Sequence, residues 1–330
     1  VAPMCSLFWG KINKILMIIF MILLMFAILF GNFLTLAVVL GTKHFHTPQG
    51  YLKASLAVAD LAVGLLVVPV SVYAEVSLVL KDAAAAPAWT AQDSQHTASL
   101  HPCAIIGPVF AGCTLVSITT VFLLTMERSI AVLKPLHKES VITRRRTMML
   151  IGCSWTGSFF LALSPLMFNK HMVLEYNACS RMCNYASGGD EFQSQAWHIL
   201  LLFPAFDFTL LVGTVVTNII SFTTIRHHSK KRRRLTRAAE QTASGPSFSD
   251  IKAAKTIGAL TLGFTASFTP VAVFVVGNVA GNQWCTFSFF AFWILATSSC
   301  WNVIIYSVRD QKFRLRARQL LMFSKIKTSA

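Results

Sequence analysis

The chain has 330 residues, of which 55% are hydrophobic and 13% are charged, and its formal net charge is +16. Soluble domains contain about 25% charged residues, so this composition excludes an ordinary soluble domain. A strongly positive charge is common in proteins that bind nucleic acids, but its distribution along this chain argues against that class.

Seven apolar stretches are each long enough to cross a bilayer, which takes about 20 residues of helix. They cover residues 13–42, 49–80, 101–133, 147–168, 196–225, 252–280 and 285–308. The first stretch has no small-residue cleavage site and is too long for a signal peptide, so we expect it to be a span. We predict an all-α membrane protein. A seven-helix transmembrane bundle (13–308) follows an extracellular segment (1–12) and precedes a short amphipathic eighth helix and tail (309–330).

Most of the 29 Lys and Arg residues fall on one side of the membrane if the N-terminus lies outside. They concentrate in the segments 226–255 and 309–327, which then face the cytoplasm, as the positive-inside rule requires. The outer loops are then 81–102 and 169–195, and the third inner loop is 227–249. We expect a multi-pass plasma-membrane protein whose charge serves orientation, anionic lipid and an intracellular partner, and no nucleic acid.

Polar residues deep in the first two spans need partners inside the bundle. Asn32 lies in span one, and Asp60 is the only acid deep in span two. One interpretation of Asp60 is an ion or proton site, with Ser117, Ser298 and Asn302 as candidate ligands at similar depth, because oxygen ligands suit a hard cation. The alternative is a buried carboxyl group that is hydrogen-bonded to Asn32.

Four of the eight cysteines fall at predicted outer ends of spans, where disulfides form: Cys103, Cys179, Cys183 and Cys285. A bond between Cys103 and the loop after span four would hold that loop over the bundle. Cys183 is the preferred partner, because its distance from Pro204 leaves room for a loop end and half a span. A Cys179–Cys183 bond within the loop is the alternative.

Span three ends abruptly in Glu127-Arg128, an ionised pair that is costly in lipid unless it lies at the water boundary or faces protein. Arg128 is then a switch that folds onto Glu127 or extends to a partner from the cytoplasm. The alternative is an arginine that merely reaches the interface from a helix end. Pro270 in the middle of span six makes a hinge, and Asp250 at the inner end of that helix is placed to hold Arg128.

Span five contains an acid, Asp207, for which the sequence suggests no role beyond being neutral or hydrogen-bonded to span three or six. After span seven, residues 310–323 intersperse apolar residues with Arg314, Arg316 and Arg318. That pattern is typical of an amphipathic helix on the inner leaflet.

Motifs along nearly the whole chain resemble those of the rhodopsin-like (class A) G protein-coupled receptors. They are Gly31-Asn32, the SLAVAD run Ser55–Asp60, Cys103, Glu127-Arg128-Ser129, Trp155, Pro204, Phe264 with Pro270, Asn302 with Tyr306, and Phe313-Arg314. Each motif is weak alone, but their common order and spacing are specific. The phrase Lys252–Thr256 resembles the biogenic-amine and trace-amine receptors.

The resemblance implies a receptor, with no catalytic activity and no required cofactor. Its partners would be a heterotrimeric G protein, for which we favour the stimulatory class, arrestin, and membrane lipid. Span six would move outward about Pro270 and break an Arg128–Asp250 contact, and Leu136 would dock in the G protein. Asn302 and Tyr306 would belong to the same switch, and an allosteric sodium ion would occupy the Asp60 site in the inactive state.

Several positions depart from the family pattern. Phe110 stands where the amine receptors have their amine-binding acid, Phe268 replaces a tryptophan, and Val212, Val303 and Ser129 replace three other switch residues. A protonated amine would therefore lack its usual counter-ion. We also expect an unusual balance of states, with either high basal activity or weak coupling.

The cavity that the resemblance implies is nearly all apolar. Its residues are Phe110, Ala111, Thr114, Phe268, Val271, Ala272, Val275, Phe292 and Ala296. This lining favours a neutral or lipid-like ligand, or Tyr185 entering the cavity as a built-in agonist. The alternative for the aromatic stripe is core packing.

A transporter or channel is the competing function for a polytopic chain. The sequence shows no inverted repeat and no run of pore-lining charges, which argues against it. An enzyme is least favoured, since no metal-spaced His/Asp cluster and no Ser/His/Asp set stands out.

Overall fold

The computed structural model describes residues 11–80, 102–133, 141–169, 172–187, 199–238, 248–282 and 284–328. Within these ranges, seven helical segments are long and apolar enough to cross a membrane. They are α2 (Lys11–Gly41), the continuous α3 (Pro48–Ala62), π-helical segment (Val63–Val67) and α4 (Val68–Leu80), α5 (Pro102–Leu133), α7 (Arg144–Phe168), α9 (Leu202–Ala238), α10 (Phe248–Val279) and α11 (Cys285–Arg309). The predicted seven-helix bundle is confirmed.

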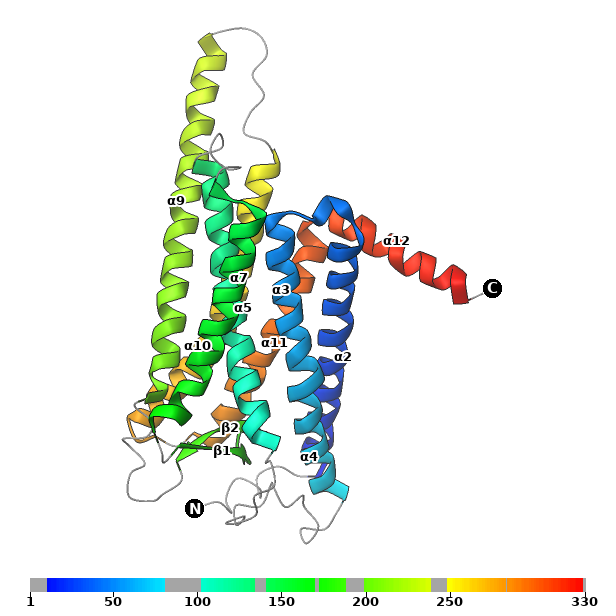
Figure 1. The fold of residues 1–330 in the computed structure, drawn as a ribbon, viewed down its shortest axis with the longest axis vertical. Coiled ribbons are helices and arrows are strands. Elements are labelled where there is room, and N and C mark those ends of the chain that lie inside the picture. The colour runs from blue at the N-terminus through cyan, green and yellow to red at the C-terminus, as the bar shows by residue number, and fades with distance from the viewer. Residues whose placement is uncertain are drawn as a thin grey trace.

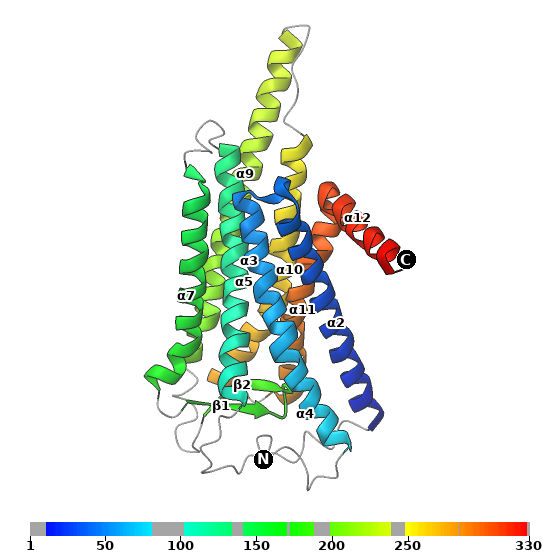
Figure 2. The same cartoon turned by 45° about the vertical axis from the view of Figure 1, so that its right-hand side comes forward.

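One further helix, α12 (Gln311–Thr328), follows α11 and turns away from the bundle (Figures 1 and 2). Asp310 forms the corner, because the Phe313 amide donates to its Oδ1 at 3.1 Å and so starts the new helix. The Phe313 side chain is fully buried against Tyr306, whereas Arg314 and Arg316 are exposed. The predicted amphipathic eighth helix is therefore present.

Helix α5 occupies the centre of the bundle, in contact with α3, α7, α9 and α10. Polar bonds between neighbouring helices add to this packing, as they commonly do where lipid provides no hydrogen-bond partner. Trp155 on α7 donates to the Ser55 hydroxyl on α3 at 2.9 Å. Asn32 on α2 donates to the Ser299 carbonyl oxygen on α11 at 2.9 Å and to the Ile28 carbonyl oxygen at 3.0 Å. These bonds hold the helices in register around α5.

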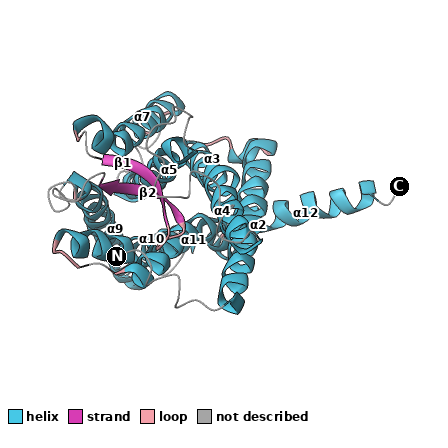
Figure 3. Ribbon diagram, turned by 90° about the horizontal axis from the view of Figure 1, so that it is seen from below, coloured by secondary structure: helices cyan, strands magenta, loops and turns pink. Residues whose placement is uncertain are grey.

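An antiparallel hairpin, β1 (Met172–Asn177) and β2 (Met182–Ser187), lies across the end of the bundle (Figure 3), opposite the end that carries α12 (Figure 1). Tyr176 pairs with Cys183 in its register. The loop predicted over 169–195 thus contains a sheet that the sequence pattern did not indicate.

The first half of the predicted third inner loop, 227–249, is helical, because α9 continues beyond its candidate span of Leu202–Thr224 as far as Ala238. Lysine and arginine are good helix formers, so the basic run is compatible with this continuation of the helix. The remainder, 239–247, lies outside the described residues. So do 1–10 and 81–101, which hold most of the predicted N-terminal segment and first outer loop.

Candidate functional site

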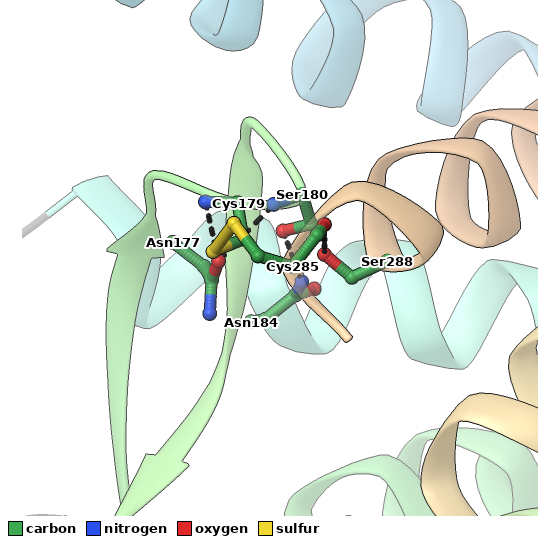
Figure 4. The surroundings of a disulfide bond; sticks show 6 residues. All are labelled: Asn177, Cys179, Ser180, Asn184, Cys285 and Ser288. Atoms are coloured by element: carbon green, nitrogen blue, oxygen red, sulfur yellow. Dashed lines mark hydrogen bonds between the residues drawn. A yellow bond between two sulfur atoms is a disulfide. The ribbon is translucent and has the colours of Figure 1, made fainter. Parts of the chain in front are cut away.

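Two disulfides fix the hairpin to the bundle. Cys103 at the start of α5 is joined to Cys183 on β2, with a Cα–Cα distance of 5.1 Å, as expected from the sequence. Cys179 in the hairpin turn is joined to Cys285 at the start of α11, with a Cα–Cα distance of 4.8 Å (Figure 4). The second bond excludes the alternative Cys179–Cys183 pairing. Sequence reasoning placed all four cysteines outside but missed this pair, because nothing showed that the turn reaches α11.

The turn of the hairpin is rigidly hydrogen-bonded (Figure 4). The Asn177 side-chain oxygen accepts from the amides of Cys179 at 2.8 Å and Ser180 at 3.1 Å. The Trp293 indole on α11 donates to the Ser180 carbonyl oxygen at 3.0 Å. Arg181 has the left-handed φ of 58°, which is uncommon for a non-glycine residue. This backbone turn directs the Arg181 side chain toward α4.

A buried ion pair joins the hairpin to α4. The Arg181 Nη1 atom lies 3.0 Å and 3.1 Å from the two carboxylate oxygens of Glu75, whose side chain is fully buried. The Tyr176 hydroxyl donates to Glu75 Oε1 at 2.6 Å. Burial, and then the adjacent Glu75 carboxylate, raise the pKa of Tyr176 well above its usual range, so its hydroxyl remains a donor. No pattern in the sequence indicated this three-residue cluster.

A cavity of about 100 Å³ lies under the hairpin, between α5, α9, α10 and α11. Nine of the ten residues predicted for a pocket line it, namely Phe110, Ala111, Thr114, Tyr185, Phe268, Val271, Ala272, Val275 and Phe292. Ala296 is buried but does not line the cavity. Leu295, the residue before it on α11, lines the cavity instead.

Helix α9 supplies lining residues that sequence reasoning missed: Phe203, Pro204 and Asp207. One oxygen of Asp207, Oδ1, is fully buried and has no hydrogen-bond partner among the described residues. The sequence marked Asp207 as an unusual acid but did not fix the rotation of its helix. The cavity is therefore mostly apolar, with one carboxyl group in its wall.

Tyr185 lies at the edge of this cavity, held between two helices. Its hydroxyl donates to the Ala162 carbonyl oxygen on α7 at 2.5 Å, and its ring lies 5.6 Å from that of Phe203 on α9. Burial raises the pKa of Tyr185, which keeps the hydroxyl protonated. The hairpin thus inserts one aromatic residue into the cavity wall.

A second set of polar side chains, separate from the cavity lining, surrounds Asp60. Ser117 donates to Asp60 Oδ1 at 3.4 Å, and Asn302 donates to Asp60 Oδ2 at 2.9 Å. The third polar side chain beside the carboxylate is Ser299 rather than the predicted Ser298. Asn32 donates elsewhere, so the alternative Asn32–Asp60 bond is absent. Asn302 Oδ1 is buried and lacks a hydrogen-bond partner in the described ranges, which leaves an oxygen free for a cation.

At the inner end of α5, Arg128 is folded onto protein. Its Nε lies 3.5 Å from Glu127 Oε2, and its Nη2 donates to the Gln49 side-chain oxygen on α3. Glu127 is buried, with 7% of its surface exposed. The contact of Arg128 with Asp250 stays a prediction, because the Asp250 side chain and all of Leu136 lie outside the described part. Pro270 lies within α10, as the hinge hypothesis requires.

Lys53 forms a further inner contact that sequence reasoning missed. Its Nζ lies 3.3 Å from Asp310 Oδ2 and 4.6 Å above the centre of the Tyr306 ring. Tyr306 is itself buried and packs on Phe313, with ring centres 6.2 Å apart. One lysine on α3 therefore holds the end of α11 and the start of α12 together.

Comparisons with known proteins agree with this geometry. The family described as "7 transmembrane receptor (rhodopsin family)" matches residues 31–306. Trace amine-associated receptor 7d of Rattus norvegicus is 27% identical over 303 residues, which are 90% of this chain and 79% of that protein. 5-Hydroxytryptamine receptor 1 of Aplysia californica is 23% identical over 323 residues, 86% of this chain and 67% of the relative. The D(1B) dopamine receptor of Homo sapiens is 27% identical over a shorter stretch, 43% of this chain and 27% of its own length. These relatives are receptors and not enzymes.

Proposed function

Because the chain belongs to the rhodopsin family of seven-transmembrane receptors, we propose that it activates a heterotrimeric G protein of the stimulatory class from the plasma membrane. Its N-terminus faces outward in this proposal, and the basic ends of α9 and α12 face the cytoplasm. Arrestin is a second partner for the same inner surface. The exposed arginines of α12 rest on anionic lipid.

The observation that carries this proposal is the position of Arg128. Its guanidinium lies at the inner end of the bundle and contacts Glu127 and Gln49 rather than extending away from protein. Both contacts are hydrogen-bonding or ionic, so an incoming protein segment is able to exchange with them. Outward movement of the inner part of α10 about Pro270 opens that space, and the contact of Arg128 with Asp250 is then lost.

A sodium ion at Asp60 stabilises the resting state in this proposal. The carboxylate, Ser117 and the free Oδ1 of Asn302 are the oxygen ligands that a hard cation prefers. The ion supplies a positive charge that offsets the buried carboxylate. Neither signalling nor folding requires any other cofactor.

The cavity under the hairpin is the ligand site in this proposal, and its apolar walls favour a ligand with a neutral or lipid-like body. The relatives are named for amines. Phe110 stands where the family pattern places the amine-binding acid, so an amine would need another counter-ion. Tyr185 is a built-in agonist in this proposal, since the hairpin holds its ring in the cavity wall.

Basal cAMP in cells that express the wild type or Arg128→Ala at equal surface density tests the proposed coupling. We expect wild-type cAMP above that of mock-transfected cells and a loss of most of that increment in Arg128→Ala. Arg316→Ala, on the exposed face of α12, is the matched control. Equal cAMP for wild type and Arg128→Ala would contradict the proposed role of Arg128. Ion currents that persist in Arg128→Ala would instead favour a transporter or channel.

Replacement of residues 184–187 tests the built-in agonist. We expect basal cAMP to fall while surface expression is kept, because Tyr185 leaves the cavity. Unchanged basal signalling would remove this part of the proposal.

A further inference from the structure

Asp207 is the one acidic side chain in the wall of the cavity, counted over the described residues. Its Oδ1 is fully buried and has no hydrogen-bond partner among them. The rest of the described lining is largely apolar, so protein groups solvate this carboxyl group poorly. An ionised carboxylate that is isolated in such surroundings is costly, and a cation close to it removes that cost.

The described protein offers no cation for this position. The cavity lining contains one other titratable side chain, Tyr185, and its hydroxyl is already donated to the Ala162 carbonyl oxygen. Arg181, on the same hairpin, is bound to Glu75. Ion pairing for Asp207 is therefore left to a molecule that enters the cavity.

The remaining walls fit the other end of such a molecule. Phe292 lies between two further rings of the lining, with ring centres 6.5 Å from Phe110 and 5.6 Å from Phe274. Aromatic faces attract organic cations, and they also bury an apolar body. Phe203, one turn before Asp207 on α9, adds a ring next to Tyr185.

We infer that the cavity binds a small molecule with a basic nitrogen on an apolar body, and that the Asp207 carboxylate holds that nitrogen. The inference rests on the proposed ligand site, and it replaces the expectation of a neutral ligand. The counter-ion that is absent at Phe110 on α5 is supplied from α9, across the same cavity. An ammonium ligand meets the carboxylate directly, or a free base takes the proton from the carboxylic acid, and both routes end in the same ion pair.

Binding of 2-phenylethylamine and of 2-phenylethanol to the purified full-length receptor tests the inference. The two probes share an aryl body and differ in charge. We expect the amine to bind at least tenfold more tightly than the alcohol. Asp207→Asn should remove that preference, and Asp207→Glu, which keeps the charge, should recover part of it.

Equal affinity for amine and alcohol in the wild type, or no saturable amine binding, overturns the inference. So does an Asp207→Asn receptor that keeps the full preference for the amine. The wild-type comparison needs no variant, so the test remains decisive if Asp207→Asn does not fold. If signalling depends on Arg128 but the receptor shows no preference for the amine, only this inference is contradicted. If the receptor prefers the amine but activates no G protein, only the proposed coupling is contradicted.

Discussion

The outer and inner ends of the bundle are held together by different kinds of bond. At the outer end, the hairpin is attached by two disulfides and by the ion pair between the fully buried Glu75 and Arg181. At the inner end, Arg128 contacts Glu127 and Gln49, and Lys53 contacts Asp310 and the Tyr306 ring, all without a covalent bond. The outer end is therefore permanent, while the inner contacts are able to exchange within one folded state. A molecule that receives a signal at one end and transmits it at the other benefits from this division.

The largest expected effect is at the buried ion pair of the outer end. Arg181→Met leaves the Glu75 carboxylate buried without its cation, which costs about 3–5 kcal/mol. We expect a marked fall in the melting temperature of the purified receptor and in surface expression. Arg316→Met, an exposed arginine at the inner end, is the control and should change stability by less than about 0.5 kcal/mol. Similar small effects for both would remove the distinction between the two ends.

Removal of the Cys103–Cys183 disulfide should have the next largest effect on stability. Replacement of both cysteines by alanine should cost about 2–4 kcal/mol, because the unfolded chain is no longer constrained. Thermal unfolding of the double variant measures this loss. Cys153→Ala, which removes an exposed free cysteine, should unfold as the wild type does. A double variant as stable as the wild type would mean that the other contacts of the hairpin suffice.

Tyr176→Phe should have a smaller effect, because Arg181 still neutralises Glu75. The lost hydrogen bond to a charged group is worth about 1.5–3 kcal/mol. Because the pKa of Tyr176 is raised, the stabilisation by this hydrogen bond also depends on pH. This stabilisation is complete below the usual tyrosine pKa of about 10 and is lost as the pH rises toward the raised value. In a double-mutant cycle with Glu75→Gln, stability should show coupling of the two residues; additive effects would contradict the contact.

Lys53→Met should have the smallest effect on stability and act mainly on signalling. It removes the ion pair of a buried lysine with the partly exposed Asp310, and a cation–π contact, which together are worth about 1 kcal/mol. These two contacts hold Tyr306 in its resting arrangement, so we expect their loss to raise basal cAMP about fivefold. Lys312→Met, an exposed lysine at the same end, should leave basal cAMP unchanged. A fall in cAMP for Lys53→Met would mean that Lys53 supports the active arrangement instead.

Much of the fold was predictable from the sequence, because the bilayer fixes span length and loop charge fixes direction. The family pattern correctly predicted that Phe110, Phe268 and Phe292 line the cavity. Contacts that depend on how a loop folds were not predictable. The turn at Arg181 brings the hairpin into contact with Glu75 and Cys285. The sequence around these two residues does not predict either contact.

The other misses concern which of two neighbouring residues on a helix reaches a site. Ala296 and Ser298 are both buried, but Leu295 lines the cavity and Ser299 lies beside Asp60. Asp207 was noticed as unusual, but an apolar span with weak periodicity does not reveal which face its one acid occupies. The sequence therefore marked residues of interest more reliably than it assigned their directions.

The connectivity of the two disulfides also sets an order of assembly. Cys183 finds its partner 80 residues earlier in the chain, whereas Cys179 needs one that comes 106 residues later. A chain made from its N-terminus is therefore able to close the first bond long before Cys285 has been synthesised. The second bond waits until Cys285 emerges at the start of the last span, so it reports that the six preceding helices have been inserted.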